Sequence, residues 1–136
     1  MPRLMELGRM VHFESRYARF DFDPAKVMRM VHEAIPQGLT FVLEDAGTIV
    51  GVFVGVIGAH FFGEDTVGYD RVLFVIPEHR GLGGVLLIRE YVRRAKALGV
   101  RDIHLGTSTG IAEARMLALC EKLGFSRIGG FCAMEN

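Results

Sequence analysis

The chain contains no tryptophan, two cysteines, four prolines and no excess of charge of either sign. Two thiols cannot form a disulfide framework, so we expect a reduced compartment and a cytoplasmic protein. Sixteen basic residues balance sixteen acidic ones, which disfavours a nucleic-acid surface. The longest apolar run, IVGVFVGVIGA at 49–59, is too short for a membrane span, and residues 1–10 lack the apolar block of an export signal.

The 136 residues are enough for one domain with its own hydrophobic core, and half of them are hydrophobic. No linker, repeat or low-complexity segment divides the chain. We therefore expect a single domain over residues 1–136. The five histidines have no metal-ligand spacing with one another or with the cysteines, so we predict no metal site.

The first third of the chain predicts two amphipathic helices. Leu4, Leu7 and Val11 recur at helical spacing, and this first helix should end within residues 12–20. A second helix is predicted over 22–35, capped by Asp23 and begun by Pro24. Pro36 and Gly38 should stop it.

The middle of the chain changes to strand-like sequence. Segments 39–44, 49–62 and 69–76 are rich in β-branched and aromatic residues, and turn residues at 45–48 and 63–68 separate them. This pattern predicts an antiparallel meander.

The last third alternates helices and strands. A helix is predicted over 85–98, a short strand over 100–105 and a helix over 108–123 capped by Ser108 or Thr109. A final strand is predicted over 125–134. The whole chain therefore predicts a mixed α/β sheet with helices on its faces.

The stretch PEHRGLGGVLLIR at 77–89 joins a strand to a helix through three glycines and an arginine. Unpaired N–H groups at a helix start carry partial positive charge, and glycine lets an anion approach them. Leu86 stands where a dinucleotide fingerprint needs its third glycine, and the Gly-Lys-Ser/Thr of nucleotide hydrolases is absent. The pattern alone leaves open whether this is a pyrophosphate cradle or a tight turn.

Two motifs resemble the GNAT acetyltransferase superfamily. VLFVIPEHRGLGG at 72–84 is similar to its strand and (Gln/Arg)-x-x-Gly-x-(Gly/Ala) signature, and LCEKLGF at 119–125 to its Leu-Tyr-x-Lys-x-Gly-Phe. The short sequences ESRY, HFFG and PEHRG resemble those of small phage and bacterial members of this superfamily. The resemblance implies a mixed, mostly antiparallel sheet flanked by helices, here without the usual first strand. The sheet edge this leaves could be covered by a neighbouring chain in a homodimer or by another segment of this chain, or the start could be shortened.

The resemblance also implies acetyl-CoA as donor, held at the end of the third strand. Arg80 takes the first signature position and Gly83 its glycine, while Val85 departs from the usual last residue and Gly84 could replace it. The N–H of Val75 or Ile76 would hold the oxyanion. The strand segment from Leu73 to Ile76 would face residues 102–108 across a gap. The complete donor set is Phe74, Val75, Ile76, Arg80, Gly81, Leu82, Gly83, Gly84 and Val85.

Several residues are candidates for the catalytic groups. Cys120 stands at the position of the family's tyrosine and could protonate the leaving thiolate, or it could simply be a small core residue. Candidate bases are Asp70, Glu14 and His60, each with an ordinary structural alternative. Tyr17 could line the acceptor wall beside Glu14.

The predicted function is acetyl transfer from acetyl-CoA to a primary amine of a small molecule, peptide or protein. The alternative is a non-catalytic domain of the same fold that binds CoA or a partner protein. No nucleic-acid or membrane partner is expected.

Overall fold

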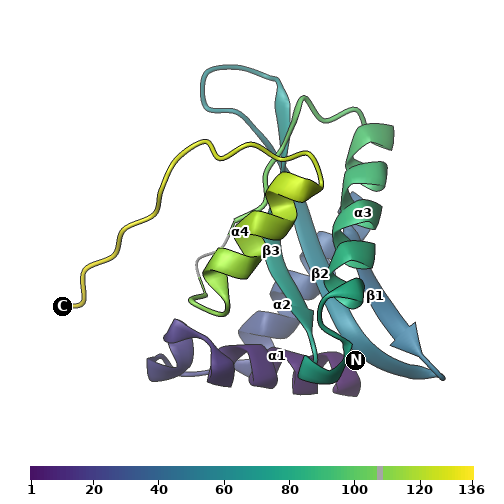
Figure 1. The fold of residues 1–136 in the computed structure, drawn as a ribbon. Helices are drawn as coiled ribbons and strands as arrows, with labels where there is room; N and C mark the ends of the chain where they lie inside the picture. Colours follow the sequence, from purple (N-terminus) through teal and green to yellow (C-terminus); the bar gives the residue numbers. More distant parts are fainter. Residues whose placement is uncertain (107–108) are drawn as a thin grey trace.

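The computed structural model describes residues 1–106 and 109–136 as a four-stranded sheet flanked by helices (Figure 1). The helices are α1 (Pro2–Glu14), α2 (Pro24–Ala34), α3 (Leu82–Ala97) and α4 (Glu113–Lys122), and the strands are β1 (Thr40–Asp45), β2 (Thr48–Ala59), β3 (Thr66–Val75) and β4 (Asp102–Ile103). Short 3₁₀ turns lie at η1 (Arg16–Arg19), η2 (Ile35–Gln37) and η3 (Pro77–His79). None of the described helices has the length and apolar character needed to cross a membrane.

The sheet has the order β1-β2-β3-β4 and confirms the predicted mixed topology. The first three strands form the predicted antiparallel meander, with Phe41 opposite Phe53 and Val52 opposite Phe74. Strand β4 pairs with β3 in parallel, after the α3 crossover. Strand β1 lies at one edge of this order.

Alternate residues of the central strands feed two separate cores. Val52 and Val54 of β2 point to the face covered by α1 and α2, where they pack with Leu7 and Val31. Phe53, between them, points to the other face and packs against α3. This division follows from the two-residue period of a strand.

Several local signals act as predicted. The side chain of Asp23 accepts a hydrogen bond from Lys26 N at the start of α2. Gly38 ends η2 in the left-handed region, and Gly99 and Gly124 have positive φ after α3 and α4. These positions suit glycine because a Cβ atom disfavours that conformation.

Several predicted elements need correction, and the strand predicted over 100–105 is reduced to Asp102–Ile103. The predicted strand at 125–134 is absent: the segment has no regular structure and leads away from the sheet (Figure 1). A strand forms only by pairing with another strand. Gly129 and Gly130 disfavour one here, because glycine loses more backbone entropy on ordering and has no side chain to pack. Strand β3 also begins at Thr66, within a predicted loop, and α3 begins at Leu82, three residues early.

Thr109 does not cap α4, which begins at Glu113 after Ala112. The hydroxyl of Thr109 instead accepts a hydrogen bond from Ile111 N, and Gly110 has a φ of +77°. This local turn delays the helix start. The other predicted cap, Ser108, lies outside the described residues.

Candidate active site

Strands β3 and β4 separate soon after they meet. They pair only at Val67–Asp102 and Gly68–Ile103 among the described residues. His104 N then donates to Gly68 O (2.9 Å), and Gly106 N donates to the carboxylate of Asp70 (2.8 Å). Beyond Asp70, the described residues offer β3 no strand on this side. The sheet therefore has a gap along the second half of β3.

A β-bulge lies where the gap opens. The register of β2 and β3 pairs Val54 with Val72 and Gly55 with Asp70, which leaves Arg71 as an extra residue. A bulge bends a strand and increases its local twist. It thereby turns the second half of β3 away from the direction of its first half.

The backbone of β3 presents donors to this gap. Ile76 N already donates to Val50 O of β2 (2.9 Å). Because neighbouring residues of an antiparallel strand turn their N–H groups to opposite sides, Val75 and Leu73 turn theirs toward the gap. Of the two candidate oxyanion donors, Val75 is therefore the one that faces it.

Helix α3 starts next to the end of β3 and has no side-chain cap. Gly81 precedes it with a φ of +89°, a conformation that favours glycine, and its carbonyl accepts from Val85 N (3.1 Å). The first N–H groups of the helix, at Leu82, Gly83 and Gly84, have no intrahelical acceptor. They form a positive end suited to a phosphate.

The three glycines have different physical roles. A Cβ atom on Gly83 would lie 2.9 Å from side-chain atoms of both Leu43 and Val75, so Gly83 is required by the packing of α3 on the sheet. A Cβ atom on Gly81 would meet nothing within 4 Å, and one on Gly84 would lie 3.9 Å from Leu119 of α4. The spatial constraint of the signature glycine is therefore helix packing.

Arg80 is held by an acidic residue far away in the sequence. Its Nη1 and Nη2 donate to the two carboxylate oxygens of Glu14 at 2.7 and 2.6 Å, and its Nε donates to Val75 O at 2.9 Å. The hydrogen bonds from Arg80 lower the pKa of Glu14, and Glu14 raises that of Arg80. A carboxylate with a lowered pKa is a weak proton acceptor, which disfavours Glu14 as a base.

The charge of Asp70 acts on the thiol of Cys120. Burial raises the pKa of the Asp70 carboxyl, against the opposing hydrogen bond from Gly106 N. Burial, and then the charge of Asp70, raises the pKa of the Cys120 thiol. Asp70 is thus a stronger base than an exposed aspartate, and Cys120 stays protonated at neutral pH. The fold therefore combines one candidate base with the candidate acid.

His60 lies away from the glycine loop. It follows the end of β2 where Ala59 pairs with Thr66, whereas the glycine loop follows the other end of β3, about 30 Å along the strand. Its ring stacks on Phe61 at 4.8 Å, and its Nδ1 accepts from Phe62 N. Tyr17 lies in η1 and stacks on Phe20.

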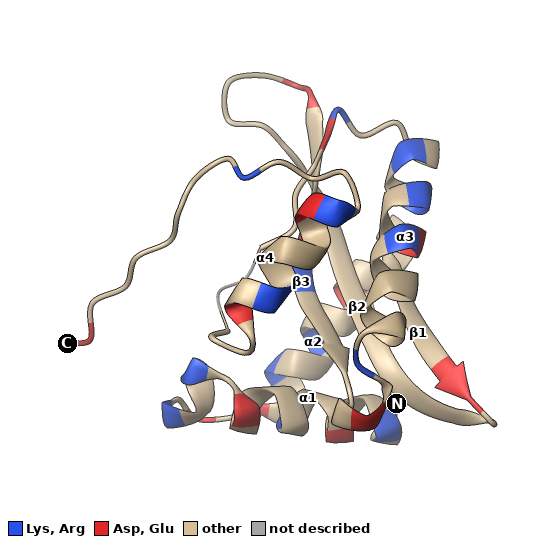
Figure 2. Ribbon diagram, in the orientation of Figure 1, with Lys and Arg blue, Asp and Glu red and all other residues tan. Residues whose placement is uncertain are grey.

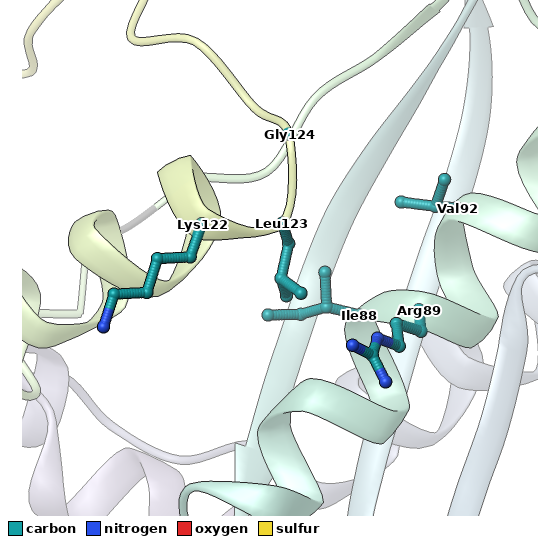
Figure 3. Close-up of a pocket in the computed structure, with 6 residues that line it drawn as sticks. All are labelled: Ile88, Arg89, Val92, Lys122, Leu123 and Gly124. Carbon is teal, nitrogen blue, oxygen red and sulfur yellow. The ribbon is translucent and has the colours of Figure 1, made fainter.

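A cavity of about 440 Å³ that the sequence did not indicate lies between α3 and α4 (Figure 3). It is lined by Ile88, Arg89, Val92, Lys122, Leu123 and Gly124. Two of these residues are cationic, and Figure 2 shows further basic residues along α3. No predicted site residue lines the cavity. Its walls come from two helices that are far apart in the sequence, so local sequence did not indicate it.

The described residues contain no group of three or more His, Cys, Asp or Glu side chains arranged to hold a metal ion.

Comparison with known proteins connects this geometry to one family. The model of the acetyltransferase (GNAT) family matches residues 7–125. No curated protein sequence matches the chain.

Three solved structures illustrate the range of proteins with this fold. An aminoglycoside acetyltransferase from an uncultured soil metagenomic sample, in complex with sisomicin, has a TM-score of 0.68 at 17% identity, with 99% of this chain and 90% of that chain covered. Glucosamine-6-phosphate N-acetyltransferase from Arabidopsis thaliana has a TM-score of 0.66 at 18% identity, with 85% and 80% covered. A transcriptional regulator from Bacillus halodurans C-125 has a TM-score of 0.71 at 20% identity, with 97% and 94% covered. At these identities the likeness shows the fold alone.

Proposed function

Since the chain belongs to the GNAT acetyltransferase family, we propose that it transfers the acetyl group of acetyl-CoA directly to a primary amine. The proposal includes a cytoplasmic location, where the reduced thiols would persist.

One observation carries this proposal: the gap beside β3 ends at the uncapped start of α3. The gap offers the N–H groups of Leu73 and Val75 to an extended amide chain, as a missing strand would. The start of α3 offers N–H groups to phosphates. Acetyl-CoA carries both features in one molecule, a pyrophosphate and a pantetheine chain with two amides. The residues present therefore fit this donor.

The chemistry follows from the groups around the gap. Acetyl-CoA supplies a thioester carbonyl that the amine nitrogen attacks. Asp70 would accept the proton that the amine loses. Val75 lies five residues along β3 from Asp70, roughly 16 Å in an extended strand, so its N–H would hold the pantetheine chain and not the reacting carbonyl. Cys120 would give its proton to the CoA sulfur as the C–S bond breaks. A proton passed from Asp70 to Cys120 would then restore both groups.

The acceptor is a primary amine whose identity needs a screen. Two structural neighbours are named for amine-bearing sugars, an aminoglycoside acetyltransferase and a glucosamine-6-phosphate N-acetyltransferase. Such small-molecule amines are the first to test, followed by peptide N-termini and lysine side chains.

The donor site can be tested by thermal unfolding with and without acetyl-CoA. At about 100 times the dissociation constant, binding adds roughly 2.7 kcal/mol, a rise of several degrees in the unfolding midpoint. Leu82 is exposed at the first position of α3, so Leu82→Asp suits the helix end in the free protein but repels phosphate. We expect Leu82→Asp to lose the rise and the neutral control Leu82→Asn to keep most of it. No rise in the wild-type protein at millimolar acetyl-CoA would overturn the proposal.

A second candidate is a domain that binds CoA or a partner protein without turnover. The fold's occurrence in a transcriptional regulator favours keeping this candidate, as does Cys120 in place of the family's tyrosine. The amine panel separates the two by measuring release of the free CoA thiol. Acceptor-dependent release supports the enzyme, whereas a thermal shift with no release from any amine supports the binding domain.

A homodimer through the β1 edge is a further part of the proposal. Strand β1 lies at one end of the sheet order, so its outer backbone groups can pair with another strand. Size-exclusion chromatography with light scattering tests this, and a clean monomer at high concentration removes it.

A further inference from the structure

The contact between Glu14 and Arg80 has a geometry that suits exchange with a ligand. A carboxylate bound by both terminal nitrogens of an arginine presents two oxygens much as a phosphate does. The pair joins the last residue of α1 to the loop immediately before α3. Both side chains are about one-third exposed, at 33% and 34%, so water and solutes can reach the pair. Glu14 therefore occupies a position where a donor phosphate would otherwise meet Arg80.

Arg80 cannot bind Glu14 and a donor phosphate with both terminal nitrogens at the same time. Its Nε is used by Val75 O and its two terminal nitrogens by Glu14, and the nearby charge of Glu78 adds to the negative potential. A phosphate at the start of α3 would be repelled by Glu14 and would compete with it for the guanidinium. In the free protein, the carboxylate of Glu14 thus neutralises the positive charge of Arg80.

A released Glu14 would be poorly placed without a new cation. It is the last residue of α1, where the helix dipole disfavours negative charge. The segment that follows is held by a hydrogen bond to a distant part of the chain, because Arg16 N donates to Thr109 O at 2.7 Å. Glu14 would therefore stay beside the gap, on the helix that covers the face opposite α3.

We propose that the donor phosphate displaces Glu14 from Arg80, and that the freed carboxylate then binds a cationic group of the acceptor. The inference rests on the proposed function and extends it: Glu14 is a specificity-determining residue, and cationic acceptors bind after the donor. No covalent step is involved.

Calorimetric titration with acetyl-CoA tests the exchange. Glu14→Gln removes the competing charge, so we expect its dissociation constant to be about five-fold lower than that of the wild-type protein. The matched control is Glu6→Gln on the same helix, whose carboxylate pairs with Arg3 at 2.7 Å, and it should bind like wild type. Unchanged or weaker binding by Glu14→Gln overturns the exchange. Absence of binding by every protein instead removes the proposed function itself.

The release of Glu14 can also be observed directly by NMR titration of its side-chain carboxyl. In the free protein Arg80 holds the pKa of Glu14 below its ordinary value. Saturation with CoA should raise that pKa, because Arg80 has changed partner. A pKa that stays low in the CoA complex means that Glu14 keeps Arg80, and it overturns the exchange independently of affinity.

The acceptor half is tested with sisomicin, a polycationic amine, titrated into CoA-saturated protein. We expect Glu14→Gln to bind sisomicin more weakly than Glu6→Gln, and both to bind it poorly without CoA. Equal affinity of the two variants, or no binding by either, overturns the acceptor half.

Discussion

The two edges of strand β3 have opposite characters. Toward β2, the strand is paired from Thr66 to Val75 except at the bulge, and its side chains enter both cores. Toward β4, it is paired at two positions and then faces a gap. One edge thus stabilises the protein, while the other leaves backbone donors free for a ligand. Substitutions on the paired side should therefore lower the free energy of unfolding, whereas those at the gap should change the acetylation rate.

The largest effect is expected on the paired side, at Phe53. Its side chain is fully buried and stacks between Phe41 and Tyr91, at ring distances of 5.1 and 4.4 Å. Phe53→Ala should lower the free energy of unfolding by about 3–5 kcal/mol, measured by urea denaturation. The control is Arg71→Ala at the exposed bulge, which should change it by less than about 0.5 kcal/mol. Similar losses for both variants would contradict the comparison.

Asp70→Asn should separate activity from stability at the gap. Asparagine keeps an oxygen that can accept from Gly106 N but cannot act as a base, so we expect the acetylation rate to fall about 100-fold. Because burial raises the pKa of Asp70, the wild-type protein loses stability as pH rises from about 3.9 through that raised pKa.

The asparagine variant lacks this loss, and it should unfold at a higher temperature than wild type at pH 7 but not at pH 3. Unfolding midpoints at the two pH values check the sign. An unchanged rate would assign the base elsewhere.

The adjacent glycines of α3 should respond in opposite directions. Gly83→Ala places a Cβ atom 2.9 Å from Leu43 and Val75 side-chain atoms, and this overpacking should cost about 1–3 kcal/mol. Gly84→Ala has room and removes a flexible residue from a helix, so it should stabilise the protein by up to about 1 kcal/mol. Thermal unfolding of the two variants compares them directly, and equal losses would show that Gly84 is as crowded as Gly83.

The smallest effect is expected at Tyr91, where the paired region ends. Its hydroxyl donates to His104 O at 2.7 Å, next to the last backbone bond between β4 and β3. Tyr91→Phe keeps the buried ring but removes this bond, and it should cost about 1 kcal/mol. Hydrogen exchange should become faster at His104 N–H and stay unchanged in β2. Unchanged exchange at His104 would mean that the hydroxyl does not hold β4.

Much of the fold could be predicted from local sequence because its signals are local. Helical spacing of apolar residues, the Asp23 cap and the turn glycines act within a few residues of one another, and these elements are present. The strand predicted at 125–134 was wrong because a strand depends on a partner that local sequence does not specify. The delayed start of α4 likewise follows from a turn in which Thr109 uses its hydroxyl on Ile111 N.

The candidate site was predictable as a list of residues and not as an arrangement. The motif located Arg80 and the glycines, but the partner of Arg80 is Glu14, 66 residues away. The charge of Asp70 acts on Cys120 only once α4 is in place, and the cavity between α3 and α4 has walls from two separate helices.

Local sequence was enough to predict the four helices, the antiparallel meander and the family, because periodicity, caps and the glycine signature are carried by neighbouring residues. Folding in three dimensions sets which side of β3 stays open, which N–H groups face the gap and which carboxylate binds Arg80. These depend on strand register, a bulge and long-range ion pairing, and such contacts form between residues that the chain brings together only when it folds.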